Sequence, residues 1–223
     1  MRIRTLADLI SDVRLRADNQ ALPDSVLVEF INQSISDLYD MLTSAFGDEY
    51  FEVESIVNTT PTVPTIPVPS DFYKLNGLFW QNGSYFYRII KVQPMEAEQY
   101  LIGIGWNTFY DVRYRLQAAN IHFYPTPLGT HPVKIKYVPC AVRLVASTDT
   151  FDGYNGWEEW VVLDSAAKCL EREGNDGDLA LIVGRKEKQE QRIRDLADRD
   201  RNEPARVQDT NVGTPWAWRK RAY

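Results

Sequence analysis

Residues 157–173 constrain the fold most, because apolar side chains occupy most of the circumference of the helix that they predict. The apolar positions are Trp157, Trp160, Val161, Leu163, Ala166, Ala167, Cys169 and Leu170. The polar positions form only a narrow seam of Glu158, Glu159, Asp164, Lys168 and Glu171. A helix of this kind must be covered from more than one side, so we expect other elements to surround it.

A second helix follows the turn at residues 173–177. It is expected to begin after Asp176, a residue type that favours the N-cap position. Apolar residues lie near both of its ends, but its middle, residues 185–192, contains none. Glu190 and Arg194 have the four-residue spacing that stabilises a helix. The middle is therefore predicted to face solvent or the polar surface of a partner.

Two more helices are predicted before residue 48. Residues 5–17 repeat apolar side chains at spacings of three and four, and Thr5 with Asp8 resembles a capping box. Residues 24–46 show the clearest helical pattern, with one apolar and one polar face. Gly47 is expected to end this helix.

The middle of the chain changes to patterns typical of strands. Alternation and turn signals predict strands at residues 50–54, 73–80, 85–92, 112–117, 121–124 and 133–138. Residues 59–70 contain four prolines and are expected to run extended along a surface. Residues 94–101 are predicted to form a short helix.

These patterns predict an α+β fold that is mainly helical. It consists of a helical bundle body, an inserted small antiparallel β domain and an extended C-terminal tail. The expected parts are residues 1–48 for the N-terminal helices, 49–150 for the β insert, 151–201 for the C-terminal helical hairpin and 202–223 for the tail.

The charge balance limits the classes of partner. A net charge of −6 disfavours a general nucleic-acid coat, because phosphate binding depends on clustered Lys and Arg. The sequence shows neither a signal core nor an apolar run of transmembrane length, so synthesis in a cytoplasm and no contact with a membrane are expected.

Cys140 and Cys169 are expected to be free thiols with a structural role.

The tail, residues 202–223, is net cationic and rich in aromatic residues, although the chain as a whole is acidic. Trp, Tyr and Arg are the residue types that most often anchor interfaces. A docking role is therefore predicted for Arg206, Trp216, Trp218, Arg219, Lys220, Arg221 and Tyr223. The alternative, a tail that folds back on its own body, stays open.

No specific catalytic, cofactor-binding or metal-binding motif occurs, so no catalytic residue, cofactor ligand or metal ligand is assigned. His122 and His131 are expected to be structural. The nominal carboxylate pairs of a glycosidase are Glu158 with Glu159 and Asp149 with Asp152. Exposed aromatics between Lys and Arg, at residues 85–88 and 110–115, leave a binding surface for single-stranded nucleic acid as a weaker alternative.

Three groups of residues carry a resemblance to a known family. They are residues 28–39 (VEFINQSISDLY), residues 68–73 (VPSDFY), and residues 157–168 (WEEWVVLDSAAK) together with 199–209 (RDRNEPARVQD). These stretches resemble the head-to-tail adaptor proteins, also called connector or head completion proteins, of tailed bacteriophages.

The resemblance implies a structural protein of the virion neck, synthesised in the host cytoplasm. It implies a dodecameric ring beneath the portal protein, through which DNA passes without specific binding, with tail or nozzle proteins on the opposite side. The C-terminal tail would reach the portal, and negative charge around a channel would repel phosphate. It further implies that a neighbouring subunit supplies the second cover of the apolar helix.

Two alternatives remain beside this interpretation. One is a phage-associated peptidoglycan hydrolase, and the other is a tail-tube or other minor structural protein of the virion. In each case Trp157, Trp160, Val161 and Leu170 are expected to pack in the core or between subunits.

Overall fold

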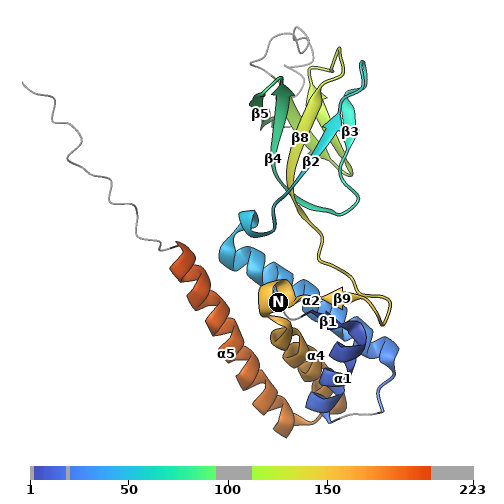
Figure 1. Cartoon of the computed structure of the whole chain (residues 1–223), viewed down its shortest axis with the longest axis vertical. Helices are drawn as coiled ribbons and strands as arrows, with labels where there is room; N and C mark the ends of the chain where they lie inside the picture. Colours follow the sequence, from blue (N-terminus) through green and yellow to red (C-terminus); the bar gives the residue numbers. More distant parts are fainter. Residues whose placement is uncertain (1–2, 19–20, 94–111, 202–223) are drawn as a thin grey trace, which may run out of the picture. The chain divides into compact units, whose positions relative to one another are not determined.

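The structure is a computed structural model, and it describes residues 3–18, 21–93 and 112–201. It divides into two compact units (Figure 1). The helical unit comprises Met1–Phe46 and Leu144–Tyr223, and the β unit comprises Gly47–Arg143. The predicted helix at 94–101 and the predicted docking tail at 202–223 lie outside the described residues.

The helical unit begins with β1 (Arg4–Thr5) and α1 (Leu6–Ala17). The Thr5 side chain accepts a hydrogen bond from the Asp8 backbone N–H, and the Asp8 side chain accepts one from the Thr5 N–H. The predicted capping box and helix are therefore confirmed. A short strand, β9 (Thr150–Phe151), pairs with β1 and ties the later part of the chain to the start of α1.

The next helix, α2 (Asp24–Phe46), has the predicted bounds. Its apolar side chains recur every three or four residues and are at most 1% exposed: Leu27, Ile31, Ile35, Leu38 and Leu42. Gly47 follows with a φ of 93°, a backbone conformation that glycine adopts without steric cost. The regular apolar spacing thus defines the length of this helix.

The C-terminal hairpin consists of α4 (Glu158–Glu173) and α5 (Asp176–Arg201), preceded by the short α3 (Gly153–Gly156). Gly174 ends α4 in the left-handed conformation. The start of α5 differs from the prediction, because Asp176 is already helical and the Asn175 Oδ1 atom accepts the N–H of Asp178 at 3.4 Å. An Asn caps a helix as well as an Asp does, and the two adjacent candidates could not be ranked from sequence.

The β unit contains a short 3-10 helix, η1 (Asp48–Phe51), followed by one seven-stranded sheet. The strands are β2 (Val53–Asn58), β3 (Thr65–Pro67), β4 (Phe72–Asn82), β5 (Tyr85–Lys91), β6 (Arg113–Gln117), β7 (Asn120–Tyr124) and β8 (Pro132–Pro139). Their order is β2-β8-β4-β5-β6-β7-β3, and the β5–β6 pair is parallel whereas the others are antiparallel. β3, from the proline-rich segment, lies at one end of this order, as an extended proline-containing segment should.

Alternation along the strands separates a core face from an outward face. On β8, Val133 and Ile135 are fully buried while Lys134 and Lys136 form ion pairs at the surface. The core face also contains the buried Leu78, Trp80, Ile89, Ile121 and Phe123. This side-chain period of two fixes which face of each strand is covered.

The expectation of a mainly helical protein with a small antiparallel β domain is wrong. Helices make up 47% and strands 28% of the structure, and a nearly closed seven-stranded sheet dominates the β unit. The strand predicted at 50–54 begins later, because η1 occupies Asp48–Phe51 and β2 starts at Val53. Periodicity identified several strands, but the size of a sheet depends on pairings between segments far apart in the chain.

The unit boundary also lies earlier than the composition suggested. Residues from Leu144 onward belong to the helical unit, although the β insert was expected to extend to residue 150. The Asn32 side chain in α2 accepts the Leu144 N–H at 2.8 Å and donates to the Leu144 carbonyl at 2.9 Å. These two bonds fix the returning chain on α2.

Candidate interaction surfaces

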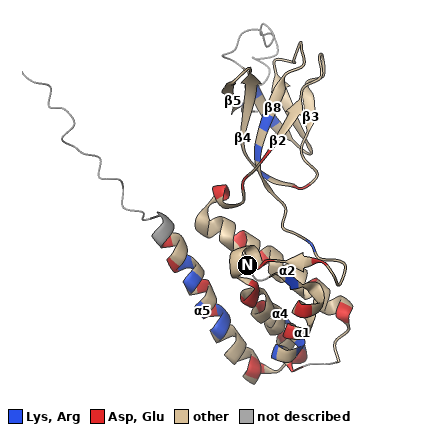
Figure 2. Cartoon of the chain, in the orientation of Figure 1, with Lys and Arg blue, Asp and Glu red and all other residues tan. Residues whose placement is uncertain are grey.

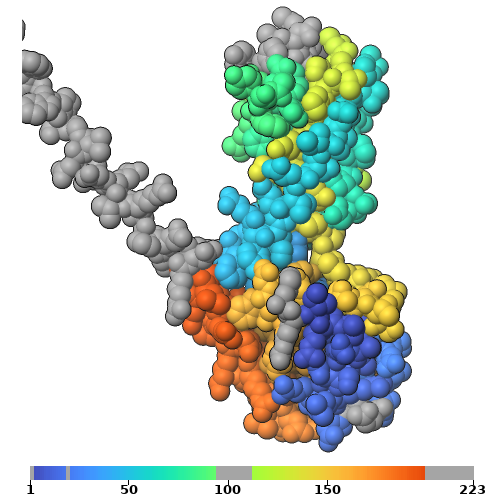
Figure 3. All heavy atoms as spheres, viewed as in Figure 1, coloured from blue at the N-terminus to red at the C-terminus, as the bar shows by residue number. Residues whose placement is uncertain are grey.

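The apolar helix α4 is covered within its own chain. It contacts α1, α2 and α5, which are drawn beside it in Figure 1 and with all heavy atoms in Figure 3. Trp160, Val161 and Leu170 are at most 3% exposed. Trp157 lies just before the helix and is half-buried. The expectation that a neighbouring subunit supplies the second cover is therefore unnecessary, because α1, α2 and α5 provide it.

A buried carboxylate joins three helices. Asp164 of α4 is 5% exposed and accepts a hydrogen bond from the Ser34 hydroxyl of α2 at 2.6 Å. Its carboxylate lies 2.8 Å from Nζ of Lys168 and 3.1 Å from Nζ of Lys186 on α5. Lys168 also donates to Asp37 of α2 at 2.9 Å. This cluster, the Asp164 network, satisfies a charge that would otherwise be costly to bury.

The network shifts the pKa of its members. Burial alone would raise the pKa of Asp164, but hydrogen bonds from Lys168, Ser34 and Lys186 outweigh burial and leave it below its ordinary value. Burial would lower the pKa of Lys168, but Asp164 and Asp37 outweigh burial and leave it raised. Both groups therefore stay ionised around neutral pH.

Helix α5 attaches to the bundle largely through polar and cation–π contacts. Its buried apolar residues are Ile182, Ile193 and Ala197. The Nζ atom of Lys186 lies 5.8 Å from the centre of the Trp160 ring, and the guanidinium carbon of Arg192 lies 5.6 Å from that of Trp157. Basic and acidic positions follow the length of this helix (Figure 2). The predicted polar middle of the helix thus contacts α4 in part.

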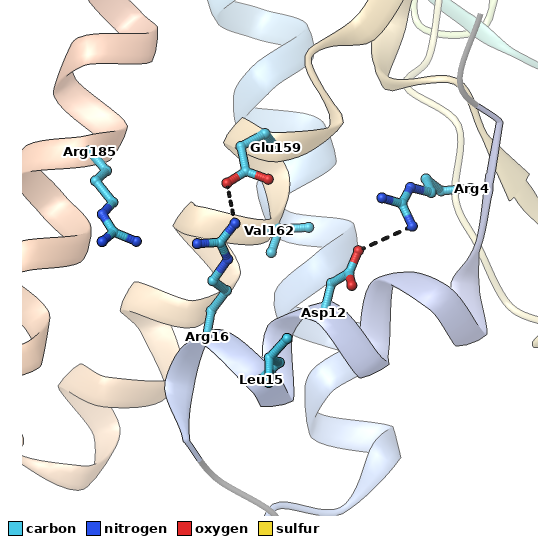
Figure 4. Close-up of a pocket in the computed structure, with 7 residues that line it drawn as sticks. All are labelled: Arg4, Asp12, Leu15, Arg16, Glu159, Val162 and Arg185. Carbon is cyan, nitrogen blue, oxygen red and sulfur yellow. Dashed lines mark hydrogen bonds and ion pairs between the residues drawn. The ribbon is translucent and has the colours of Figure 1, made fainter.

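A polar hollow of about 480 Å³ lies between α1, α4 and α5 (Figure 4). It is lined by Arg4, Asp12, Leu15, Arg16, Glu159, Val162 and Arg185. Arg16 forms an ion pair with Glu159 at 2.8 Å, and Arg4 forms one with Asp12 at 3.5 Å. Sequence reasoning missed this hollow because 143 positions separate Arg16 from Glu159.

The nominal glycosidase carboxylates have structural roles. Asp149 accepts the N–H groups of Val145 and Ala146, and these two hydrogen bonds lower its pKa. Asp152 accepts the N–H of Tyr154 at the start of α3, and Glu159 pairs with Arg16. The fourth, Glu158, is in the first turn of α4.

Metal and histidine chemistry finds no support in the described ranges. Within residues 3–18, 21–93 and 112–201, no three or more His, Cys, Asp or Glu side chains gather as metal ligands would. His131 packs edge-on against Trp80 with ring centres 5.1 Å apart, and burial lowers its pKa. His122 is paired within the sheet on β7. Cys140 and Cys169 are free thiols, as predicted, and burial raises the pKa of Cys169 to about 11.

The outward face of the sheet is poorly suited to phosphate. Lys134 and Lys136 form ion pairs with Glu54, at 2.9 and 3.2 Å, and Lys136 pairs also with Glu52 at 2.7 Å. Phe86 is 45% exposed, with Nζ of Lys134 4.2 Å from its ring centre. Two of the cations that a nucleic-acid surface would use are therefore already neutralised. Tyr110 of the predicted aromatic set lies outside the described residues.

All seven predicted docking residues, Arg206 to Tyr223, lie outside the described residues, so the structure leaves that prediction untested. In the part of the chain that is described, no helix combines the length and apolar character that a bilayer span requires. The polar hollow, the ion-paired sheet face and the polar attachment of α5 are surface features.

Comparison with known proteins identifies the class of this protein. The family model of the SU10 adaptor proteins matches residues 4–211, so the chain belongs to this family of phage head-to-tail adaptors. A comparison with curated proteins gives no match. Membership makes the chain a structural component of the virion at the head–tail junction. The recognition made from residues 28–39, 68–73 and 157–168 with 199–209 is thereby confirmed.

Proposed function

We propose that this protein is a non-enzymatic adaptor that forms a dodecameric ring beneath the portal protein and receives tail or nozzle proteins on its other side. The observation that carries the proposal is the match to the adaptor family over residues 4–211. An assembly role is further supported by the division of the chain into two compact units, since each can present its own surface to a different partner.

The C-terminal tail is the proposed contact with the portal. Trp216, Trp218 and Tyr223 would supply aromatic anchors, and Arg206, Arg219, Lys220 and Arg221 would pair with acidic portal surface. The tail follows directly on α5, whose last residue is Arg201.

DNA would pass through the centre of the ring without being gripped. The chain carries a net charge of −6, and a negatively charged lining repels phosphate. Binding to DNA would require clustered cations without acidic partners. The ion-paired Lys134 and Lys136 do not provide such a cluster.

Electron microscopy of the protein alone and mixed with the portal protein of the same phage tests this function. Rings that cap the portal are expected for the full chain, and deletion of residues 204–223 is expected to abolish capping. The double variant Trp216→Ala with Trp218→Ala is expected to weaken capping. Its control is Leu128→Ala, which removes a 61% exposed apolar side chain from the β unit and is expected to leave capping unchanged. Portal binding that survives the deletion would exclude the docking role of the tail.

The hydrolase alternative is separated by a turbidity assay on peptidoglycan. We expect no lysis, because Asp149, Asp152 and Glu159 are each engaged in structural contacts. Lysis that is lost in Glu158→Gln or Asp152→Asn would instead establish an enzyme.

A further inference from the structure

The lining of the polar hollow contains one more basic side chain than acidic side chains. Arg4 and Arg16 are paired with Asp12 and Glu159. Within the described residues, Arg185 makes no hydrogen bond or ion pair, and Figure 4 shows it on α5 across the hollow from Arg16 and Glu159. The hollow therefore presents a guanidinium that is available to an acidic partner.

Exposed leucines lie at the hollow and on α5 beside it. Leu15, in the lining, is 77% exposed, and Leu181, one turn before Arg185 on α5, is 66% exposed. Residues four apart lie on the same side of a helix, so Leu181 and Arg185 form one stripe. Large apolar side chains beside an unpaired cation are a combination found where a surface is covered by a partner.

The outward stripe of α2 has the opposite character. No Lys or Arg occurs anywhere in its 23 residues. The exposed positions at helical spacing are Glu29, Gln33, Ser36, Asp37, Asp40 and Ser44, of which Asp37 also pairs with Lys168 in the same chain. This stripe, the acidic α2 face, turns away from the buried side of the helix, which contains Leu27, Ile31 and Leu38.

The hollow and the acidic α2 face lie on opposite sides of α4. Val162 lines the hollow, whereas Asp164 hydrogen-bonds to Ser34 of α2. Two residues along a helix correspond to a rotation of about 200°, so these side chains point in nearly opposite directions. The helical unit thus has a hollow with a surplus cation on one side and an acidic stripe on the other.

We propose that these two faces meet between copies of this chain, so that the hollow of one subunit receives the acidic α2 face of the next. The inference rests on the proposed ring and identifies its subunit contact. Two different surfaces that fit each other produce a head-to-tail interface, which closes into a ring or extends as a filament. Arg185 gains acidic partners from the neighbouring α2, and Leu15 and Leu181 leave water.

Two variants separate the faces. The hollow variant, Leu181→Glu with Arg185→Glu, removes the exposed leucine and reverses the surplus charge. The α2 variant, Glu29→Lys with Asp40→Lys, reverses the acidic face. All four side chains are at exposed positions, so both variants are expected to fold, and circular dichroism verifies this. Sedimentation velocity over a concentration series then compares the wild type, each variant and their equimolar mixture.

The wild type is expected to associate into multimers, and each variant alone is expected to lose association at least tenfold. The mixture is expected to recover association, because the intact α2 face of one variant fits the intact hollow of the other and the two reversed faces again carry opposite charges. Arg194→Glu and Glu187→Lys each reverse one charge, with the same signs as the two variants, on another side of α5, and both are expected to associate like the wild type.

Association of both variants at the wild-type level would overturn this contact. Self-association of the α2 variant alone would indicate a hollow-to-hollow dimer and would also overturn it. If the wild type associates only on the portal, the wild type and the variants are compared by the number of copies bound to each portal particle. If wild-type rings cap the portal and both variants form the same rings, the adaptor function would stand and only the proposed contact between subunits would be wrong.

Discussion

The helical unit and the β unit both contain a network of acidic and basic side chains, but the two networks differ in burial. The Asp164 network lies among α2, α4 and α5, where the Asp164 side chain is 8% exposed. On the outward face of the sheet, Lys134 and Lys136 pair with Glu52 and Glu54, whose side chains are 19% and 46% exposed. The first network is enclosed by helices and the second is in contact with solvent.

The difference shows that similar ion pairs can have different consequences. A buried carboxylate without its partners bears the full cost of desolvation, so the Asp164 network is expected to fix the relative positions of three helices. An exposed pair exchanges its partner for water at little cost. The ion pairs of the sheet are therefore expected to influence the character of the surface more than the stability of the fold.

Asp164→Ala is the change with the largest expected effect. It leaves the ammonium groups of Lys168 and Lys186 without their shared carboxylate, and the free energy of unfolding is expected to fall by about 3–5 kcal/mol. Urea unfolding followed by circular dichroism measures the change. Asp37→Ala is the matched control, because it removes an acidic partner of the same Lys168 whose side chain is 60% exposed, and about 1 kcal/mol or less is expected. Equal effects of the two changes would contradict the comparison.

Acid titration should reproduce part of this loss without a mutation. The pKa of Asp164 in the folded protein lies below its ordinary value of 3.8, so its contribution to stability is fully present above that pH. As pH falls through the folded pKa, protonation of Asp164 removes the contribution. The wild type is expected to lose more stability than Asp164→Asn over this range. Parallel stability curves for the two proteins below pH 3.8 would show that Asp164 does not contribute.

Lys186→Met tests the attachment of α5. The free energy of unfolding is expected to fall by less than for Asp164→Ala, by about 1–2 kcal/mol. Met retains an apolar stem beside Trp160 but removes the ion pair of 3.1 Å with Asp164, which keeps Lys168 and Ser34 as partners. Hydrogen exchange should accelerate in α5 more than in α4. Lys188→Met, at an exposed position on the same helix, provides the control and should leave exchange unchanged.

Local sequence pattern predicted the elements that depend on neighbouring residues. The bounds of α2, the capping box of Thr5 and the end of α4 at Gly174 all follow from spacings of four residues or fewer. The sheet was underestimated because its order, β2-β8-β4-β5-β6-β7-β3, joins segments that are distant in sequence. The parallel β5–β6 pair in particular has no local signal.

The candidate surfaces were harder to predict for the same reason. An acidic residue inside an apolar helix was a visible sign that Asp164 needs a partner, but 22 positions separate it from Lys186 and 130 from Ser34. The hollow required α1 and α5 both to lie against α4, which no spacing indicates. In contrast, family membership was recognisable from short linear stretches, because these reflect ancestry and do not depend on knowing the contacts.

Glu54→Gln should have the smallest effect and tests the exposed half of the comparison. Its carboxylate pairs with Lys134 and Lys136, and hydrogen bonds from both lower its pKa, yet nearly half of its side chain is open to water. The urea midpoint is expected to stay within the error of the measurement at moderate ionic strength, and a difference visible at low salt should vanish when salt is added, because mobile ions screen exposed charges. Asp164→Asn, measured in the same salt series, should keep its deficit at every ionic strength, since its partners are enclosed by three helices. A loss from Glu54→Gln that equals the loss from Asp164→Asn and persists in high salt would mean that the sheet depends on its outward ion pairs as strongly as the helices depend on their buried one.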